Sequence, residues 1–357
     1  MMRIRITAAL PLALGLAACI PSIDRSRPTA PPPGGEPLDL PAPGDRAVDS
    51  DEISQLPAPR PAWEARPVSA DAQDVAEQTY VVRPGDSLRL IAERIGAGSE
   101  AIARANGLSA PFTIYAGQRL RIPGGRYHQV RSGQTGIAIA RAYGVQWSRI
   151  VAANELEEPY ILRTGQRVLI PGDSRAGTSY AERAAAFRLD IDDIITGGEP
   201  ALAVNQAPAK AVASSRRVLP TTAAVEAPKN GPGRFLWPVD GKVVSRFGTG
   251  ASGVRNNGVK IAVPVDTPVK ATADGTVAYV GDGIAALGGL VIVRHGENWT
   301  SVYGHASKLL VQRGQAVKKG QTIALSGDTG FADRPELHFE LRKGRTPVDP
   351  TAQLPRQ

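Results

Sequence analysis

Apolar residues follow two different periods between residues 79 and 124. Residues 80–82 are strand-forming and end at a Pro-Gly turn. Residues 88–95 then carry apolar side chains at helical spacing, and residues 102–105 continue with a second, shorter helical pattern. Residues 119–122 give a last strand pattern, which a proline stops. The segment therefore predicts a small module with the order strand, helix, helix, strand.

The same pattern returns in residues 126–172 without an insertion. Asn106 and Asn154 lie 48 positions apart (154 − 106), and the other shared residues keep this spacing. An internal repeat of this kind indicates two copies of one supersecondary unit. We call residues 79–124 the first copy and residues 126–172 the second copy, and we expect a βααβ fold for each.

From residue 233 to residue 354 the pattern changes to short β-branched runs between glycines, such as GTVAYVG at residues 275–281. Regular short strands with turn signals predict an all-β sheet or a partly open barrel. The predicted fold class is therefore multidomain. Two small α+β modules are followed by an all-β domain, and disordered linkers join them.

Two segments lack both periods and are predicted to be linkers. Residues 20–78 hold 12 of the 30 prolines, so we expect residues 19–78 to form an extended, solvated tether. Residues 173–232 are rich in Ala and Ser and are expected to form a second linker. Within it, residues 180–195 favour a short helix, to which the sequence assigns no function.

The N-terminus has the features of an export signal. Arg3 and Arg5 precede an apolar run at residues 8–18 that is too short to span a bilayer. The net charge of +8 favours an anionic or polar partner, and the single cysteine, Cys19, excludes an intrachain disulfide. Because export separates the chain from nucleic acid, we expect no nucleic-acid partner.

The sequence LAAC at residues 16–19 resembles a bacterial lipobox. In that family the signal peptide, here residues 1–18, is removed, and the new N-terminal Cys19 carries lipid. An aspartate after the cysteine would imply retention in the inner membrane, so Ile20 implies the outer membrane. We expect an outer-membrane lipoprotein that faces the periplasm. The alternative is an ordinary secretory signal in which Cys19 is incidental.

Both copies resemble the LysM module, a βααβ fold that binds glycan containing N-acetylglucosamine. In this family the sugar lies between the first strand–helix loop and the second helix–strand loop. The resemblance implies peptidoglycan glycan strands as a partner, bound through Gly85, Asp86, Ser87, Leu88, Asn106, Gly107 and Leu108 in the first copy and Gly133, Gln134, Thr135, Asn154 and Leu156 in the second. The second copy departs from the first at Gln134 and Gly136, so its sugar binding stays open. The alternative is that these residues only shape the fold.

The C-terminal region resembles the lysostaphin-type, or LytM-like, peptidase domain in strings such as FLWPVDGKVVSRFG and GQAVKKGQTIALSGDTG. Active members bind zinc through a His-x-Gly-[Ile/Val]-Asp motif and the second histidine of His-x-His, and water takes the open position. Here Asn256 and Lys260 stand at the first two ligand positions, and His338 matches the third. His305 matches one catalytic histidine, and Glu336 replaces the other.

Two of the three expected zinc ligands are therefore missing. The ammonium group of Lys260 repels a divalent cation, so we expect no catalytic residue, no metal and no cofactor in this domain. We predict instead that Lys260 and Glu336 form a salt bridge that neutralises the abandoned site. A rearranged zinc site made of His305, Glu336 and His338 is the alternative.

The lipobox, the LysM copies and the degenerate peptidase domain together resemble the murein hydrolase activator lipoproteins of the NlpD kind. The resemblance implies that the C-terminal domain activates a periplasmic N-acetylmuramoyl-L-alanine amidase, promoting septal murein cleavage and daughter-cell separation. The expected partner groove is the abandoned cleft, lined by Asn256, Lys260, Tyr303, His305, Glu336 and His338. The alternatives are a zinc endopeptidase that cuts peptidoglycan cross-links, and a passive tether between outer membrane and cell wall.

Overall fold

The computed structural model describes residues 61–172, 179–213, 219–250, 253 and 255–356. The expected signal peptide, the lipidated Cys19 and most of the predicted tether lie outside the described residues. Within the described ranges, no helix combines the length and the apolar character needed to cross a bilayer.

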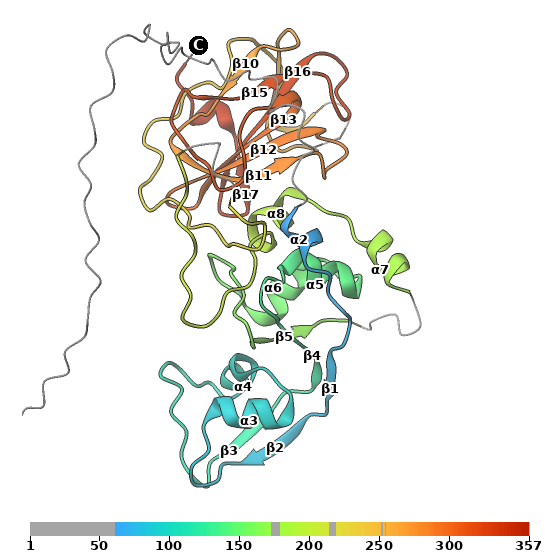
Figure 1. The fold of residues 1–357 in the computed structure, drawn as a ribbon, viewed down its shortest axis with the longest axis vertical. Helices are drawn as coiled ribbons and strands as arrows, with labels where there is room; N and C mark the ends of the chain where they lie inside the picture. Colours follow the sequence, from blue (N-terminus) through green and yellow to red (C-terminus); the bar gives the residue numbers. More distant parts are fainter. Residues whose placement is uncertain (1–60, 173–178, 214–218, 251–252, 254, 357) are drawn as a thin grey trace, which may run out of the picture. The chain divides into compact units, whose positions relative to one another are not determined.

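The first copy has the predicted order of elements (Figure 1). They are β2 (Gln78–Val81), α3 (Leu88–Ile95), α4 (Ser99–Ala105) and β3 (Arg119–Ile122), and the two strands pair antiparallel. Ser87 caps α3 by accepting a hydrogen bond from the backbone of Leu90, and Gly96 ends the helix in the left-handed conformation. Ile91 and Ile102 are fully buried in a small core of their own.

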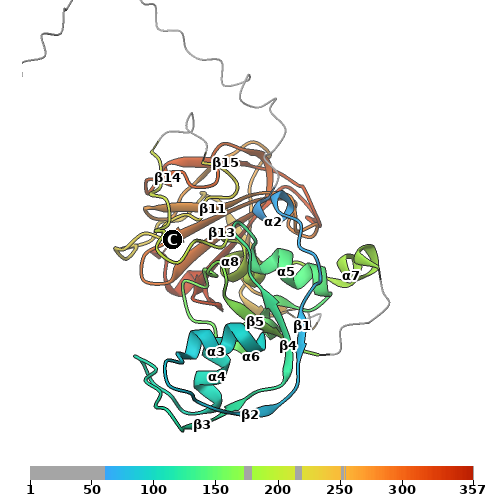
Figure 2. The ribbon, with the colours of Figure 1, turned by 60° about the horizontal axis from the view of Figure 1, so that its bottom comes forward.

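The second copy repeats this order, which confirms the prediction of two βααβ modules. Its elements are β4 (Gly125–Gln129), α5 (Gly136–Tyr143), α6 (Trp147–Asn154) and β5 (Arg167–Ile170). Strand β4 pairs with β5 on one edge and with an additional strand, β1 (Gln73–Val75), on the other, so this sheet has three strands (Figure 2). Trp147 begins α6 and is fully buried.

Part of the predicted tether is folded, which corrects the prediction for residues 61–78. Helix α2 (Ala62–Ala65) and strand β1 both lie in this range. The indole of Trp63 stacks on the ring of Tyr279 with the centroids 5.6 Å apart. The open edge of β4 offers unpaired backbone groups to β1, and burial of the Trp63 side chain favours an ordered path. The number of prolines in this segment gives no information about its contacts with β4 and Tyr279.

The predicted second linker also contains ordered structure. The single helix expected over residues 180–195 is instead two helices, α7 (Tyr180–Ala186) and α8 (Ile191–Gly197). Each helix begins with a capping box, at Ser179 and at Asp190, and the second box explains the division. We call residues 191–202, which are α8 and the five residues after it, the strap. Most residues of the strap are buried.

The C-terminal domain is the predicted all-β structure. Its main sheet has ten antiparallel strands: β6 (Lys242–Ser245), β9 (Val259–Ala262), β10 (Pro268–Lys270), β11 (Gly275–Gly281), β12 (Gly289–His295), β13 (Trp299–Leu309), β14 (Ala316–Val317), β15 (Thr322–Ser326), β16 (Glu336–Lys343) and β17 (Thr346–Val348). The order along its main path is β14-β11-β12-β13-β16-β9-β6. A separate pair, β7 (Gly248–Thr249) and β8 (Arg255–Asn256), and a 3₁₀ turn, η1 (Pro350–Ala352), complete the domain.

The two faces of the main sheet meet different surroundings. Leu337 and Leu341 of β16 belong to the domain's own hydrophobic core, as the alternation of side chains along a strand requires. Ile292 of β12 belongs instead to a second hydrophobic cluster, which it shares with Ile194 of the strap and Trp147 of the second copy. The strap and the second copy therefore pack against the same face of the sheet.

Candidate functional site

Neighbouring strands bring the predicted site residues of the C-terminal domain together. In the register of β9 with β16, Lys260 lies directly opposite His338, and Ala262 lies opposite Glu336. On the other side of β16, Gly304 of β13 lies opposite His338. Because side chains alternate along a strand, Glu336 and His338 lie on one face of β16 and reach the side chain of Lys260.

The predicted salt bridge forms. The Nζ atom of Lys260 lies 2.6 Å from Oε1 of Glu336. The Glu336 side chain is only 2% exposed, and the Lys260 side chain is 24% exposed. A buried carboxylate without a partner would be strongly destabilising, so the ammonium group is what allows Glu336 to occupy this position.

His305 reaches the site through an unusual backbone conformation. Its φ angle is +67°, in the left-handed region that non-glycine residues rarely adopt. Its Nδ1 atom lies 2.8 Å from the carbonyl oxygen of Thr329, so Nδ1 carries a proton and donates it. Its Nε2 atom lies 3.9 Å from Oε1 of Glu336, and burial lowers the pKa of the imidazole. Burial therefore disfavours the charged form of the ring beside the salt bridge.

Glu336 and His338 begin a row of polar side chains on one face of β16, and Glu340 and Arg342 continue this polar row. The Nε2 atom of His338 lies 3.0 Å from Oε1 of Glu340, and Oε2 of Glu340 accepts a hydrogen bond from Arg342 at 2.6 Å. Burial acts to raise the pKa of Glu340, but the His338 hydrogen bond and the charges of His338 and Arg342 outweigh it and leave the pKa below its usual value. Arg342 also pairs with Asp192 of the strap.

Sequence reasoning missed Glu340 and Arg342, although a signal was present. The string ELHFELR alternates polar and apolar residues over the predicted last strand. Alternation places Glu340 and Arg342 on the same face as His338, where they form a continuous row. Their partner Asp192 could not be foreseen, because it comes from a segment that was predicted to be a linker.

Tyr303 does not line the groove, which corrects the prediction. Its side chain is fully buried in the domain core, where its hydroxyl accepts a hydrogen bond from the backbone of Thr272 at 2.9 Å. Tyr303 lies opposite Phe339, and both point to the core face of the sheet. His305, two residues along, reaches the other face because its left-handed conformation breaks the alternation.

Asn256 is held by its own surroundings rather than directed toward His338. Its Nδ2 atom donates to Oγ of Ser245 at 3.0 Å and to the carbonyl of Arg246 at 3.2 Å. Its Oδ1 atom accepts a hydrogen bond from the backbone of Gly258 at 3.1 Å. These bonds fix the bend between β8 and β9, which is a structural role.

The residues present do not fit a zinc ion. An ammonium group occupies the position next to His338, and the Nε2 atom of His338 is already bonded to Glu340. Over the part of the chain that the structure describes, no three His, Cys, Asp or Glu side chains gather in a way that could hold a metal. The alternative site of His305, Glu336 and His338 is therefore not assembled.

In the first copy, several predicted glycan residues are engaged in shaping the loops. Asp86 accepts hydrogen bonds from the backbone of Arg83 and from the hydroxyl of Tyr80. The side-chain amide of Asn106 makes two hydrogen bonds to Arg121 of β3. Its Nδ2 donates to the Arg121 carbonyl, and its Oδ1 accepts from Arg121 N, both at 2.8 Å. Gly85 and Gly107 are exposed, and Leu108 is half-buried beside the core.

Two aromatic residues near this loop pair escaped the sequence analysis. Tyr115 is 71% exposed and Phe112 is 44% exposed, both in the loop between α4 and β3. Exposed aromatic rings beside a polar loop are typical of sugar-binding surfaces, because they offer an apolar platform next to hydrogen-bonding groups. The signal was the string PFTIYAGQ, in which two aromatic residues interrupt a turn-rich segment.

In the second copy the corresponding loop is buried. Gly133, Gln134 and Thr135 are all inaccessible, whereas Leu156 is half-buried. Thr135 caps α5, and Oε1 of Gln134 accepts a hydrogen bond from the backbone of Arg131 at 2.8 Å. Asn154 repeats the two hydrogen bonds of Asn106 in the first copy, here to the backbone N–H and carbonyl of Leu169 in β5. The strap covers this loop.

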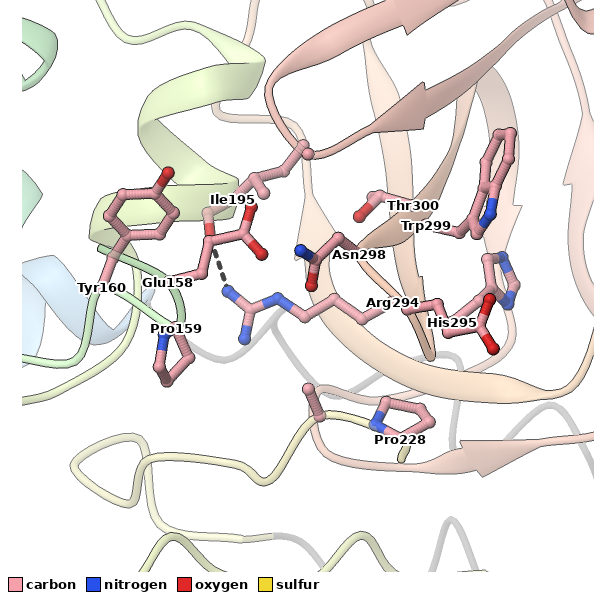
Figure 3. A pocket seen from close by; sticks show the side chains of 13 residues that line it. Glu158, Pro159, Tyr160, Ile195, Pro228, Arg294, His295, Asn298, Trp299 and Thr300 are labelled. Carbon is pink, nitrogen blue, oxygen red and sulfur yellow. Dashed lines mark hydrogen bonds between the residues drawn. The ribbon is translucent and has the colours of Figure 1, made fainter. Parts of the chain in front are cut away.

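A cavity of about 230 Å³ lies where the second copy, the strap and the sheet meet. Glu158 and Tyr160 line it on one side and Arg294 on the other (Figure 3). Burial raises the pKa of the Glu158 carboxyl. Arg294 also donates a hydrogen bond to the carbonyl of Ile195 in the strap at 2.6 Å, the dashed line in Figure 3.

Comparison with protein families agrees with this architecture. Residues 80–123 and 128–171 match the LysM domain, and residues 254–350 match peptidase family M23. The chain is therefore a LysM protein with a C-terminal domain of the M23 type.

Similarity to individual proteins identifies the family of the whole chain. The chain is 36% identical over 293 residues to the lipoprotein NlpD/LppB homolog of Pseudomonas aeruginosa, covering 82% of each chain, and it belongs to the NlpD/LppB family. It is 39% identical over 123 residues to the murein hydrolase activator NlpD of Escherichia coli, covering 34% of this chain and 32% of that one. It is also 40% identical over 152 residues to the cell division protein DipM of Caulobacter vibrioides, covering 40% of this chain and 25% of that one.

Proposed function

We propose that this protein is a peptidoglycan-binding lipoprotein of the outer membrane that activates a periplasmic N-acetylmuramoyl-L-alanine amidase. Its C-terminal domain acts without catalysis, by binding the amidase in the conformation that can cut murein. The result is septal murein cleavage and separation of daughter cells. Lipid on Cys19 holds the chain at the membrane, and the first copy holds glycan.

The salt bridge between Lys260 and Glu336 is the observation that carries the proposal. An ion pair at 2.6 Å stands where a metallopeptidase needs a cation and its ligands. A peptidase fold that keeps its shape without the metal is suited to binding rather than cutting. Its relatives that bear the name murein hydrolase activator support this assignment.

The groove proposed for the amidase centres on Lys260, His305, Glu336 and His338. The ammonium of Lys260 is the most exposed charge of this group and can meet an acidic side chain of the partner. Asn256 supports the bend at the edge of the groove. We extend the groove by Glu340 and Arg342, which continue the same row on β16.

Glycan binding is proposed for the open loops of the first copy. Gly85 and Gly107 offer backbone groups to the sugar, and Tyr115 offers an apolar face. Replacing Tyr115 by Ala should weaken binding to purified sacculi about five- to tenfold, on the scale of one well-placed aromatic contact. Phe331→Ala is the matched control, because Phe331 is a 73% exposed aromatic residue of the C-terminal domain.

Release of dye-labelled fragments from purified sacculi tests the proposal. The chain from residue 20 onward is assayed alone and with an amidase from the same cell. No release alone and strong acceleration of the amidase is the expected result. Release by the chain alone that EDTA abolishes would establish a zinc endopeptidase instead, and binding to sacculi without any effect on the amidase would establish a passive tether.

A further inference from the structure

The backbone of the second copy's loops is already paired with the chain itself. Gly133 N donates to the carbonyl of Ala201 at 3.1 Å, and Ala201 N donates to the carbonyl of Gln134 at 2.7 Å. Across the groove, Leu202 N donates to the carbonyl of Leu162 at 3.1 Å, and Thr164 N donates to the carbonyl of Leu202 at 2.8 Å. The end of the strap therefore lies as an extended segment between the two loops.

These two loops are the ones between which a LysM module holds its sugar. The first copy provides an internal comparison, because each of its residues has a counterpart 48 positions later. Gly85 and Ala116 of the first copy are exposed, whereas their counterparts are buried at Gly133 and half-buried at Thr164. The groove is open in the first copy and filled by Pro200–Leu202 in the second.

The second copy differs from the first where it seats the strap. Gly136 replaces Leu88, and a Cβ atom at Gly136 would lie 2.6 Å from the indole of Trp147. Trp147, which replaces Ser99, donates from Nε1 to the hydroxyl of Thr196 in the strap at 3.1 Å. Removal of one side chain thus makes room for an indole that binds the strap.

The opposite side of the strap is bound to the C-terminal domain. Glu199 is 5% exposed, and its carboxylate accepts hydrogen bonds from Arg294 at 2.9 Å and from Arg313 at 2.6 Å. Two guanidinium groups compensate this buried carboxylate, which makes it the main polar anchor of the strap. At the other end, Asp192 pairs with Arg342.

This second contact connects the strap to the candidate partner groove. Arg342 bonds Glu340, and Glu340 bonds His338, so Asp192 of the strap extends the polar row of β16 by one residue. While the strap is in place, Arg342 is only 3% exposed. A partner that takes the place of Asp192 on Arg342 must therefore meet a chain whose strap has moved.

We propose that the groove of the second copy is a docking site for residues 200–202 of this chain, and that peptidoglycan glycan displaces them there and releases Arg342 from Asp192. The inference rests on the proposed function, which supplies both the glycan and the partner. The strap occupies the backbone N–H groups of Gly133 and Thr164, so glycan that enters between these loops would compete with it. Glycan held by the first copy is presented to the second at high effective concentration, which favours the exchange.

By linkage, whatever displaces the strap also strengthens partner binding, and partner binding in turn strengthens glycan binding at the second copy. An activator built in this way would be most active where glycan strands are within its reach. The two copies then have different tasks: the first anchors the chain, and the second reports that glycan is present.

Hydrogen–deuterium exchange on the chain from residue 20 onward tests the proposal, with a soluble N-acetylglucosamine oligomer as the probe. Saturating oligomer should protect residues 85–88 of the first copy and raise the exchange rate of residues 191–202 at least tenfold. Protection of the first copy without faster exchange in the strap would overturn the inference and leave the proposed function intact. Absence of both effects would overturn both.

Two variants sharpen the test. Ala201→Pro removes the N–H that bonds Gln134, so the strap should exchange faster without oligomer and a second oligomer should bind. Val204→Pro is the matched control, because Val204 follows the paired segment and is 67% exposed. Arg163 and Leu202 are parallel neighbours across the groove, so Arg163→Cys with Leu202→Cys can lock the strap by a disulfide. The oxidised form should bind one oligomer and show no faster exchange, and reduction should restore the response. A locked form that binds a second oligomer would contradict the docking site.

Discussion

The ammonium nitrogen of Lys260 lies 2.6 Å from the carboxylate of Glu336, and the two residues are 76 positions apart in the chain. The resemblance to the lysostaphin type predicts a ligand at the position of Lys260 and a catalytic group at that of Glu336. Their opposite charges compensate each other in a contact between β9 and β16. The contact explains how the domain can remain folded without a metal, because neither charge is left without a partner.

Replacing Lys260 by Met should destabilise the C-terminal domain by about 2–4 kcal/mol, because it leaves the buried Glu336 carboxylate unpaired. Chemical denaturation at pH 7 measures the change. Lys318→Met is the matched control, since its pair with Asp274 is 83% and 59% exposed and should contribute less than about 1 kcal/mol. Adding Glu336→Leu to Lys260→Met should recover most of the loss. Equal effects of the two lysine substitutions would contradict the importance of the buried pair.

Zinc and EDTA should leave the unfolding temperature of the wild-type chain unchanged within about 1 °C, since the residues present do not make a zinc site. Restoring the family pattern with Asn256→His, Lys260→Asp and Glu336→His should create zinc binding with His338, because position 260 lies directly opposite it. Thermal unfolding with added zinc should then shift upward in the variant alone. A zinc-dependent shift in the wild-type chain would mean that a metal site exists.

Acid should destabilise the C-terminal domain through His295. This imidazole is 2% exposed, and burial lowers its pKa to about 4. The unfolded chain therefore binds a proton that the folded chain does not between about pH 6.5 and pH 4. Stability falls as the pH drops through this window, by about 3 kcal/mol at its lower end. Denaturation at pH 7.5, 6 and 4.5 measures the loss.

The variant His295→Gln separates this contribution from others of either sign. Burial also lowers the pKa of His305 and of His128, so these residues add to the loss in acid. Burial raises the pKa of Asp193 to about 7, so that residue acts in the opposite direction, and its contribution falls as the pH rises between about 4 and 7. The variant should show a flatter profile than the wild type. Parallel profiles would exclude His295 as the cause.

Giving the second copy the residue of the first should damage it. Gly136→Leu places atoms where the indole of Trp147 lies, so the second copy should lose about 2 kcal/mol or more. Amide exchange in α5 and α6 reports the effect. Ala152→Leu, at an exposed position of α6, should stay within about 0.5 kcal/mol of the wild type. A tolerated Gly136→Leu would mean that the indole can repack.

Local patterns in the sequence were sufficient for the elements and for much of the site. Helical spacing, turn residues and the 48-residue repeat predict both copies, because these signals act over a few neighbouring residues. The charge of Lys260 at a ligand position predicts the salt bridge, since a buried carboxylate must find a cation. The same reasoning misplaced Tyr303, because the conformation of His305 that breaks the alternation is decided by the surrounding loops.

The strap marks the limit of such reasoning. Nothing in residues 191–202 taken alone separates a linker from a segment buried against two modules. Its position is decided by groups that are distant in sequence: Arg294 and Arg313 around Glu199, and the open loop backbone of the second copy. The sequence by itself determined which modules form and that Lys260 pairs with Glu336. Only the tertiary structure decided which groove is open, because occupancy depends on complementary shape and hydrogen bonding between remote segments.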